Sequence, residues 1–277
     1  MKSLFRYSFP GFLAVAVFVA IFLYTGPGFA HLLLAPKRVV FEGRSRSATI
    51  ALLNTTNESK TYVIGWKALK IGEDGKVTQI PIDENDPYSM KKMVVFSPRR
   101  VTIEPNGRQS VRLSLRRPAD LPPGEYRGHL TFSSDPGSSE EQNISQGKDK
   151  GFSLSLRIGM GMSIPVILRN GEAVPSDVTI EDVTLSYDEK IGKQKIDYAL
   201  KHALGANSTF GVVSAYLGED RIGNLPNVTL YPEQGKRQMH LVLNKVVPPG
   251  STIRMTYTGS EEYSETIFAE KMIQVTK

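Results

Sequence analysis

The residues that most often carry chemistry in proteins are sparse in this chain and form no known catalytic pattern. The 277-residue sequence has no cysteine, which excludes thiol catalysis and zinc sites with cysteine ligands. Its four histidines stand far apart, at spacings that fit no metal-binding motif: His31, His129, His202 and His240. We therefore expect neither a metal nor a cofactor.

Motifs for nucleophilic or phosphate chemistry are also missing. The sequence contains no G-x-S-x-G elbow, no Walker A loop and no H-E-x-x-H pair. The run 159–161 (GMG) lies inside an alternating apolar segment, which indicates a close backbone approach and not a phosphate loop. The acidic run 83–86 (DEND) lacks a calcium-loop pattern and reads as a solvated loop. The sequence predicts a protein that is not an enzyme.

The basic residues show no pattern for binding nucleic acid. The formal net charge is +6, and the pairs Arg99-Arg100 and Arg116-Arg117 are not interleaved with aromatic residues. We expect no nucleic-acid partner.

The first thirty residues have the pattern of a secretory signal peptide. Lys2 and Arg6 precede an apolar run over 12–24, and small residues follow up to Ala30, where we predict cleavage. The alternative is an uncleaved membrane anchor, but the apolar run is shorter than the roughly 20 residues that a span needs. After cleavage we expect no membrane association.

The remaining chain reads as short strands separated by turns. Alternating apolar segments such as 61–69 and 110–115 recur at about ten-residue spacing, which is typical of β-sandwiches. The segment 195–204 fits a strand or a helix equally well. We predict an all-β chain with two immunoglobulin-like sandwich domains, 31–169 and 170–277.

One segment, 152–168 (FSLSLRIGMGMSIPVIL), is too long for an ordinary strand. Every even-numbered position in it is apolar. Strands are typically about 5–6 residues long. The even-numbered residues either all face the chain's own core, or part of the strand serves another protein. We favour the second reading, because a shorter strand would suffice for one core.

Several segments, in this order, resemble those of a known family. They are 38–43 (RVVFEG), 101–107 (VTIEPNG) with 110–113 (SVRL), 164–169 (IPVILR), 207–211 (NSTFG) and 248–250 (PPG). With the predicted signal and two sandwiches, they are similar to the periplasmic pilus-assembly chaperones of the chaperone–usher pathway, the PapD-like family. The resemblance implies a periplasmic protein whose two domains meet at an angle around a cleft.

The resemblance also implies a role for the long alternating segment. Chaperones of this family lend a strand to a pilus subunit that lacks its last one, and alternate apolar side chains fill the subunit's groove. The implied donor residues are Leu154, Leu156, Ile158, Met160 and Met162. The implied partners are pilus or fimbrial subunits and an outer-membrane usher, and a self-dimer without a subunit is left open.

Two further sites follow from the resemblance. Arg38 matches one of two basic residues that hold the subunit's C-terminal carboxylate, and the position of the second is occupied by Pro165. Because proline has no N–H, we expect Pro165 at a sheet edge or a bulge. Arg157 is too far along the strand to replace the missing base.

An interdomain salt bridge is implied as well. Arg169 matches the basic member of this bridge and Glu104 one of its acidic partners. The third member is expected between Tyr257 and Glu262, where Ser260 and Glu261 remain alternatives.

A different function is open on the same evidence. A secreted structural or adhesive sandwich protein could self-assemble through the same strand edge. A carbohydrate-binding sandwich would need clustered exposed aromatic residues, and the single tryptophan, Trp66, is predicted to face inward.

Overall fold

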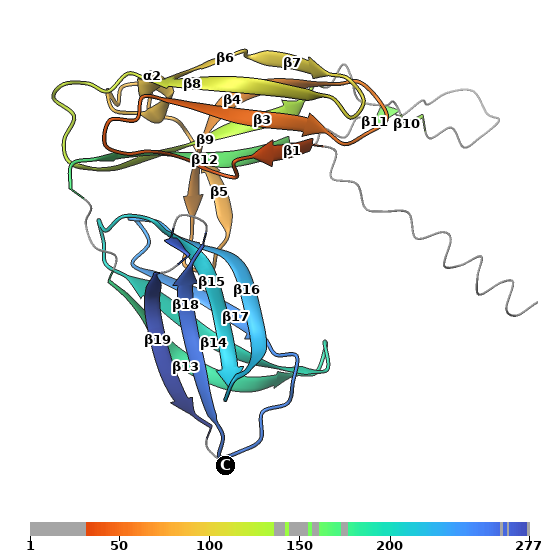
Figure 1. Cartoon of the computed structure of the whole chain (residues 1–277), viewed down its shortest axis with the longest axis vertical. Helices are drawn as coiled ribbons and strands as arrows, with labels where there is room; N and C mark the ends of the chain where they lie inside the picture. Colours follow the sequence, from red (N-terminus) through yellow and green to blue (C-terminus); the bar gives the residue numbers. More distant parts are fainter. Residues whose placement is uncertain are drawn as a thin grey trace, which may run out of the picture.

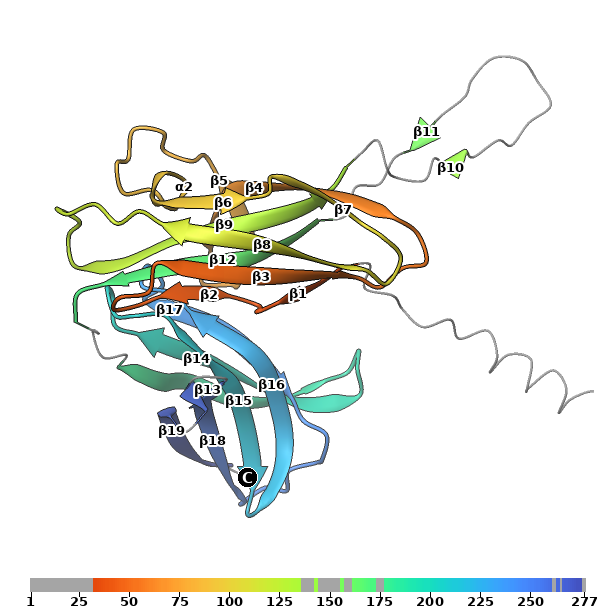
Figure 2. The ribbon, with the colours of Figure 1, turned by 45° about the horizontal axis from the view of Figure 1, so that its top comes forward.

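The computed structural model describes residues 32–135, 142–143, 155–156, 161–172, 177–260, 263–264 and 266–275. It contains two β-sandwiches that meet at an angle (Figures 1 and 2). The predicted all-β fold with two immunoglobulin-like sandwiches is confirmed. The predicted signal, 1–30, lies outside the described residues.

The first sandwich consists of two sheets. One has the strand order β1 (Leu32–Ala35), β3 (Ser47–Asn54), β8 (Arg108–Leu115) and β6 (Val94–Ser97). The other has the order β2 (Val39–Phe41), β12 (Gly161–Asn170), β9 (Gly124–Ser134), β4 (Lys60–Ile71) and β5 (Val77–Ile80), and β7 (Arg100–Ile103) pairs with β4. A short helix, α2 (Met90–Met93), leads into β6, and β10 (Gln142–Asn143) pairs with β11 (Ser155–Leu156).

The second sandwich has the same plan. One sheet has the order β13 (Val178–Asp188), β14 (Lys193–His202) and β17 (Lys236–Val242). The other has the order β16 (Asp220–Leu230), β15 (Thr209–Leu217), β18 (Thr252–Gly259) and β19 (Ile267–Gln274). The ambiguous segment 195–204 is therefore mostly a strand, since its alternate residues Ile196, Tyr198 and Leu200 face the second core.

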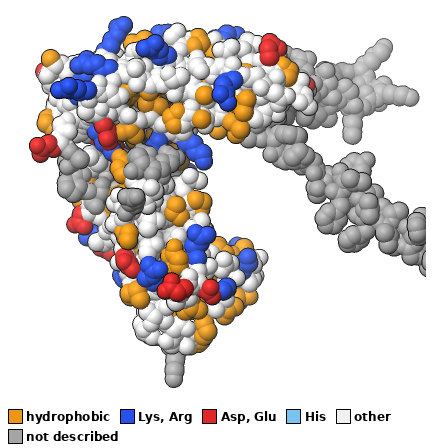
Figure 3. Space-filling model, in the orientation of Figure 1, with side chains coloured by type: hydrophobic (Ala, Val, Ile, Leu, Met, Phe, Trp, Pro, Cys, Tyr) orange, Lys and Arg blue, Asp and Glu red, His pale blue; other side chains and the backbone are white. Residues whose placement is uncertain are grey.

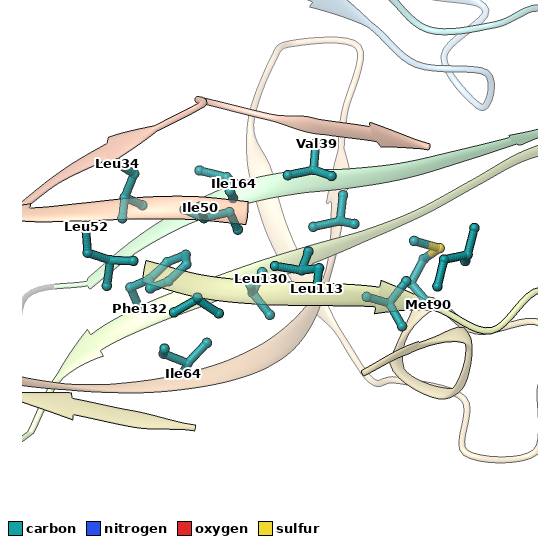
Figure 4. Packing of buried hydrophobic residues seen from close by; sticks show 14 of the residues in the cluster. Leu34, Val39, Ile50, Leu52, Ile64, Met90, Leu113, Leu130, Phe132 and Ile164 are labelled. Carbon is teal, nitrogen blue, oxygen red and sulfur yellow. The ribbon is translucent and has the colours of Figure 1, made fainter. Parts of the chain in front are cut away.

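Each sandwich has its own apolar core, built by the alternation visible in the sequence. In β8 the residues Val111, Leu113 and Leu115 point inward while their neighbours are exposed. Ile50 and Phe132 from the facing sheets are fully buried between them (Figure 4). Period-two alternation places one face of each strand inside, and the interlocking of the two faces forms the core.

Two elements have no clear signal in the sequence. All four residues of β5 are exposed, so burial imposes no apolar alternation on them. Strand β16 contains Pro226 and a residue with positive φ, Asn227 (59°), and its pairing with β15 shifts register between Leu225 and Val228. A proline next to a bulge gives a strand the sequence pattern that is typical of a turn.

Asn54 closes the end of the first sandwich where β3 and β7 finish. Its side chain is fully buried, and its amide Nδ2 donates to the carbonyl oxygens of Glu58 (2.6 Å), Ile103 (3.0 Å) and Glu104 (3.1 Å). Its Oδ1 accepts from the backbone N–H (3.1 Å) and the hydroxyl (2.8 Å) of Thr56. One amide thus satisfies polar groups from two separate segments, 56–58 and 103–104.

Asn54→Ala should lower the free energy of unfolding by about 2–4 kcal/mol, because carbonyl groups that accept from Asn54 lose their donor. Asn54→Asp should cost more, since a carboxylate would face the same carbonyl oxygens. Urea unfolding at neutral pH measures both. Thr78→Ala on the exposed β5 should change stability by less than about 0.5 kcal/mol, and equal stability of the two Asn54 variants would contradict the donor role.

Candidate functional site

Strand β12 is paired along its whole length on one side and along only part of it on the other. Its antiparallel partner β9 matches it from Gly161 to Asn170. Its parallel partner β2 pairs only with Val166–Leu168. Within the described ranges, no strand pairs with 161–165 on the β2 side. We call residues 161–165 the open edge of β12.

Pro165 is the last residue of this open edge. The pairing with β2 begins at the next residue, Val166. A residue without an N–H is tolerated at such a place because no neighbouring strand needs its donor. This position agrees with the expectation that Pro165 faces an edge.

The two faces of β12 contact different parts of the molecule. Ile164, Val166 and Leu168 are buried in the core of the first sandwich. Ile167 points to the opposite face, where it is also fully buried, against the second sandwich. Met162, at the beginning of β12, is 42% exposed. Burial on β12 therefore increases from the open edge toward the junction of the domains.

Most of the other predicted donor residues lie outside the part of the chain that the structure describes. Leu154, Ile158 and Met160 lie outside the described residues. Leu156 belongs to β11, where it pairs with Gln142. Their assignment as donor residues stays a prediction.

Arg38 lies beside the open edge. It precedes β2, whose first residue, Val39, pairs with Val166 next to Pro165. Its guanidinium carbon is 4.1 Å from the centre of the Phe210 ring in the second sandwich. The position matched to the carboxylate anchor and the position matched to the missing base are thus neighbours at the junction of the domains.

The contact between the two sandwiches, which we call the domain interface, has an apolar centre. Ile167 of β12, Phe210 of β15 and Tyr231 after β16 are buried together, with Val40 packed against them. Figure 3 shows the two sandwiches meeting here, with a hollow between them on the right of the view.

Arg169 is the main polar link across the domain interface. Its guanidinium pairs with Glu125 (3.0 Å) and with Glu42, and it donates to the carbonyl oxygen of Ser208 (2.9 Å) and to the hydroxyl of Tyr263. Burial opposes its charge, but the hydrogen bonds from Arg169 to Tyr263 and Glu125 outweigh burial and raise its pKa. Arg169 therefore stays charged.

Glu125 connects Arg169 to the second sandwich. Its side chain is only 1% exposed, and its carboxylate accepts from the backbone N–H (2.9 Å) and the hydroxyl of Ser208. A buried carboxylate with an ionic partner and two further donors is well compensated for its loss of water.

The acidic partners of Arg169 differ from the predicted one. Glu104 directly follows β7, which pairs with the part of β4 that lies beside the Ser134 end of β9. Arg169 lies at the opposite end of β9, where it is paired in register with Glu125. The structure thus places Glu125 and Glu42 where Glu104 was expected. Tyr263 supplies the third contact, next to the range that included Ser260 and Glu261.

Arg127 makes a second link across the domain interface. Its guanidinium pairs with Glu233, and its carbon lies 3.6 Å from the centre of the Tyr231 ring. With Arg38 over Phe210 and Arg169 over Tyr263 (5.6 Å), arginines of the first sandwich lie over aromatic rings of the second at three places. A cation–π contact stabilises a positive charge more strongly when the charge is partly removed from water.

Sequence reasoning missed most of these interface residues. Arg127 and His129 alternate with Gly128 and Leu130 in β9, so they occupy the face that looks away from the first core. Charged and polar residues recurring on the outer face of a central strand are the signal that could have identified an interface there.

His129 lies on this outer face, opposite Pro165 in the pairing of β9 with β12. It is 6% exposed. Burial, with a smaller contribution from the charge of Arg127, lowers its pKa to about 4. The imidazole is therefore neutral near pH 7 in the folded protein.

The described part of the chain contains no candidate metal site and no candidate membrane-spanning helix. No group of three or more His, Asp or Glu residues there could hold a metal ion. None of its helices is long and apolar enough to cross a membrane.

Comparisons with known proteins find similarity only in three dimensions. No family model and no curated protein matches the sequence. Among solved structures, 142 chains match.

Chaperones are among these structures. The YadV chaperone has 9% identity and a TM-score of 0.46, covering 88% of this chain and 99% of its own. The Pseudomonas aeruginosa CupB2 chaperone has 12% identity and a TM-score of 0.45, and the match covers 88% of this chain and 100% of the CupB2 chain. The complex of CsuC with CsuE, a chaperone with a tip adhesion subunit from Csu pili of Acinetobacter baumannii, has 15% and 0.45, covering 90% and 99%. Because these identities and TM-scores are low, we base the function on this chain's own residues.

Arg169→Ala should lower the free energy of unfolding by about 3 kcal/mol, since it leaves the buried Glu125 without its ionic partner. It should also broaden the distance between the sandwiches. Because the chain has no cysteine, spin labels at Thr49→Cys and Thr184→Cys can report that distance by pulsed electron paramagnetic resonance.

Arg254 offers a control for this variant. Within the second sandwich, its guanidinium lies 3.6 Å from the Glu270 carboxylate and 4.5 Å from the centre of the Tyr216 ring, and its side chain is only partly buried. Arg254→Ala should cost no more than about 1 kcal/mol and leave the distance distribution unchanged. An unchanged distribution in Arg169→Ala would argue against a role in setting the domain angle.

Acid should destabilise the protein in part through His129. Between pH 6.5 and 4 the unfolded chain binds a proton at this residue and the folded chain does not, so stability falls as the pH falls through this window. His129→Gln should therefore lose about 2 kcal/mol less than the wild type between pH 7 and pH 4.5. Urea unfolding at the two pH values measures this, and an NMR titration midpoint of His129 between pH 6 and 7 would contradict it.

Proposed function

We propose that this protein is a periplasmic assembly chaperone for pilus or fimbrial subunits. It binds a subunit by adding its own strand to the subunit's incomplete sandwich and holds it until an outer-membrane usher receives it. The proposal joins the resemblance in the sequence to the geometry around β12.

The open edge of β12 is the observation that carries the proposal. A sheet edge presents unpaired N–H and C=O groups that another strand can match. Here the edge leads directly into 152–160, where the apolar alternation continues beyond what the first core uses. A segment with this pattern that directly precedes an open edge in the sequence is suited to complete a foreign sheet.

Burial of the donor side chains can hold a subunit without an energy source. Each aliphatic side chain contributes about 1.5–3 kcal/mol when it leaves water. Four of them, Leu154, Leu156, Ile158 and Met160, would contribute roughly 6–12 kcal/mol as an upper estimate. Methionine adapts its shape readily, which favours binding of more than one subunit.

Arg38 is proposed to hold the C-terminal carboxylate of the subunit. A guanidinium binds a carboxylate through two parallel hydrogen bonds. In the family pattern two basic residues bind the carboxylate. Because Pro165 stands at the position of the second one, binding of the carboxylate here depends more strongly on Arg38. The Arg169 contacts hold the second sandwich, and with it one wall of this site, in place.

Ile158→Asp should abolish capture of a subunit and leave the fold intact, because a carboxylate would enter an apolar groove of the partner. The measurement is co-purification with the small secreted proteins encoded beside this gene, with circular dichroism as the check on folding. Ser155→Asp, at an odd-numbered position, should bind as the wild type does.

Two results would redirect the proposal. Capture by Ile158→Asp at the wild-type level would remove the strand-donation role. Concentration-dependent self-association that needs the same residues and is unaffected by added subunit would favour a structural or adhesive protein.

A further inference from the structure

Phe210 and Arg38 form a contact between the two sandwiches at the proposed carboxylate site. Phe210 is the second residue of β15 in the second sandwich and is 3% exposed. Arg38 precedes β2 in the first sandwich and is half-buried. The guanidinium carbon lies 4.1 Å from the ring centre, well within the range of a cation–π contact.

Stacking acts on a guanidinium in a directional way. The guanidinium lies over the ring, and the five N–H donors of an arginine point outward within the plane of that group. A carboxylate is bound through those in-plane donors. Contact with Phe210 therefore orients the donors without competing for them.

Stacking also restricts a flexible side chain before any ligand arrives. An arginine loses about 2 kcal/mol of rotamer entropy when it is fully immobilised. If the aromatic ring already limits its motion, less of this cost falls on ligand binding. Ile167 and Val40 pack in the same cluster as Phe210, so the ring that contacts the arginine is itself held by buried neighbours.

We propose that Phe210 is a positioning residue that orients Arg38 for binding a carboxylate. This inference rests on the proposed function of Arg38. It adds that the site needs both domains, because the arginine comes from the first sandwich and the ring from the second. A carboxylate is bound well only when the domain interface is formed.

The test uses acetate as the probe and needs no subunit. Acetate is titrated into the isotope-labelled mature protein at constant ionic strength, and the Nε–Hε resonance of Arg38, assigned through its loss in Arg38→Ala, is followed by NMR. Acetamide is the uncharged comparison. The wild type should give a saturable shift with acetate and none with acetamide.

Phe210→Leu keeps an apolar side chain and removes the ring, so it should raise the acetate dissociation constant at least fivefold. Phe210→Tyr retains the ring and should stay within twofold of the wild type. Tyr231→Leu is the matched control: it removes the stacking partner of Arg127 in the same interface and should also stay within twofold.

The outcomes separate this inference from the proposed function. Equal acetate affinity in the wild type and Phe210→Leu would overturn the positioning role and leave carboxylate binding by Arg38 in place. An equal loss in Tyr231→Leu would also overturn it, because general loosening of the interface would then explain the effect. No saturable shift in the wild type would overturn carboxylate binding by Arg38 and the positioning role together. Subunit capture through β12 is tested independently by Ile158→Asp.

Discussion

The guanidinium of Arg169 is the interaction on which the arrangement of the two domains depends. It stands at the end of β12, and it contacts Glu125 and Glu42 in the first sandwich and Ser208 and Tyr263 in the second. Because Glu125 also accepts from Ser208, the acid and the base are both tied to the other domain. Removing either charge would leave the other one buried without an ionic partner.

Strand β12 meets three different demands along its length. Ile164, Val166 and Leu168 fill the first core, Ile167 on the opposite face supports the domain interface, and the first half of β12 is an open edge. These demands explain why the apolar alternation in the sequence breaks at Ile167. A strand that is buried on both faces becomes continuously apolar, whereas one that is buried on a single face alternates.

The domain interface combines apolar burial with stacked cations. Arg38, Arg127 and Arg169 each lie over an aromatic ring of the second sandwich. Acidic side chains balance the charge of Arg127 and Arg169. For Arg38, the proposed function adds the carboxylate of a subunit as a ligand. An interface of this kind supports a rigid angle and also places Arg38 next to the open edge of β12.

The sequence by itself determined the strands and their inward faces, because alternation is a local property that each segment carries alone. It also indicated the long apolar alternation over 152–168 and the special place of Pro165. It was silent on β5, whose exposed residues leave no alternation. The tertiary structure alone decided that Arg169 pairs with Glu125 and Glu42 and not with Glu104, and that Phe210 stacks on Arg38. Those partners are distant in sequence, and only strand register and domain docking bring them together.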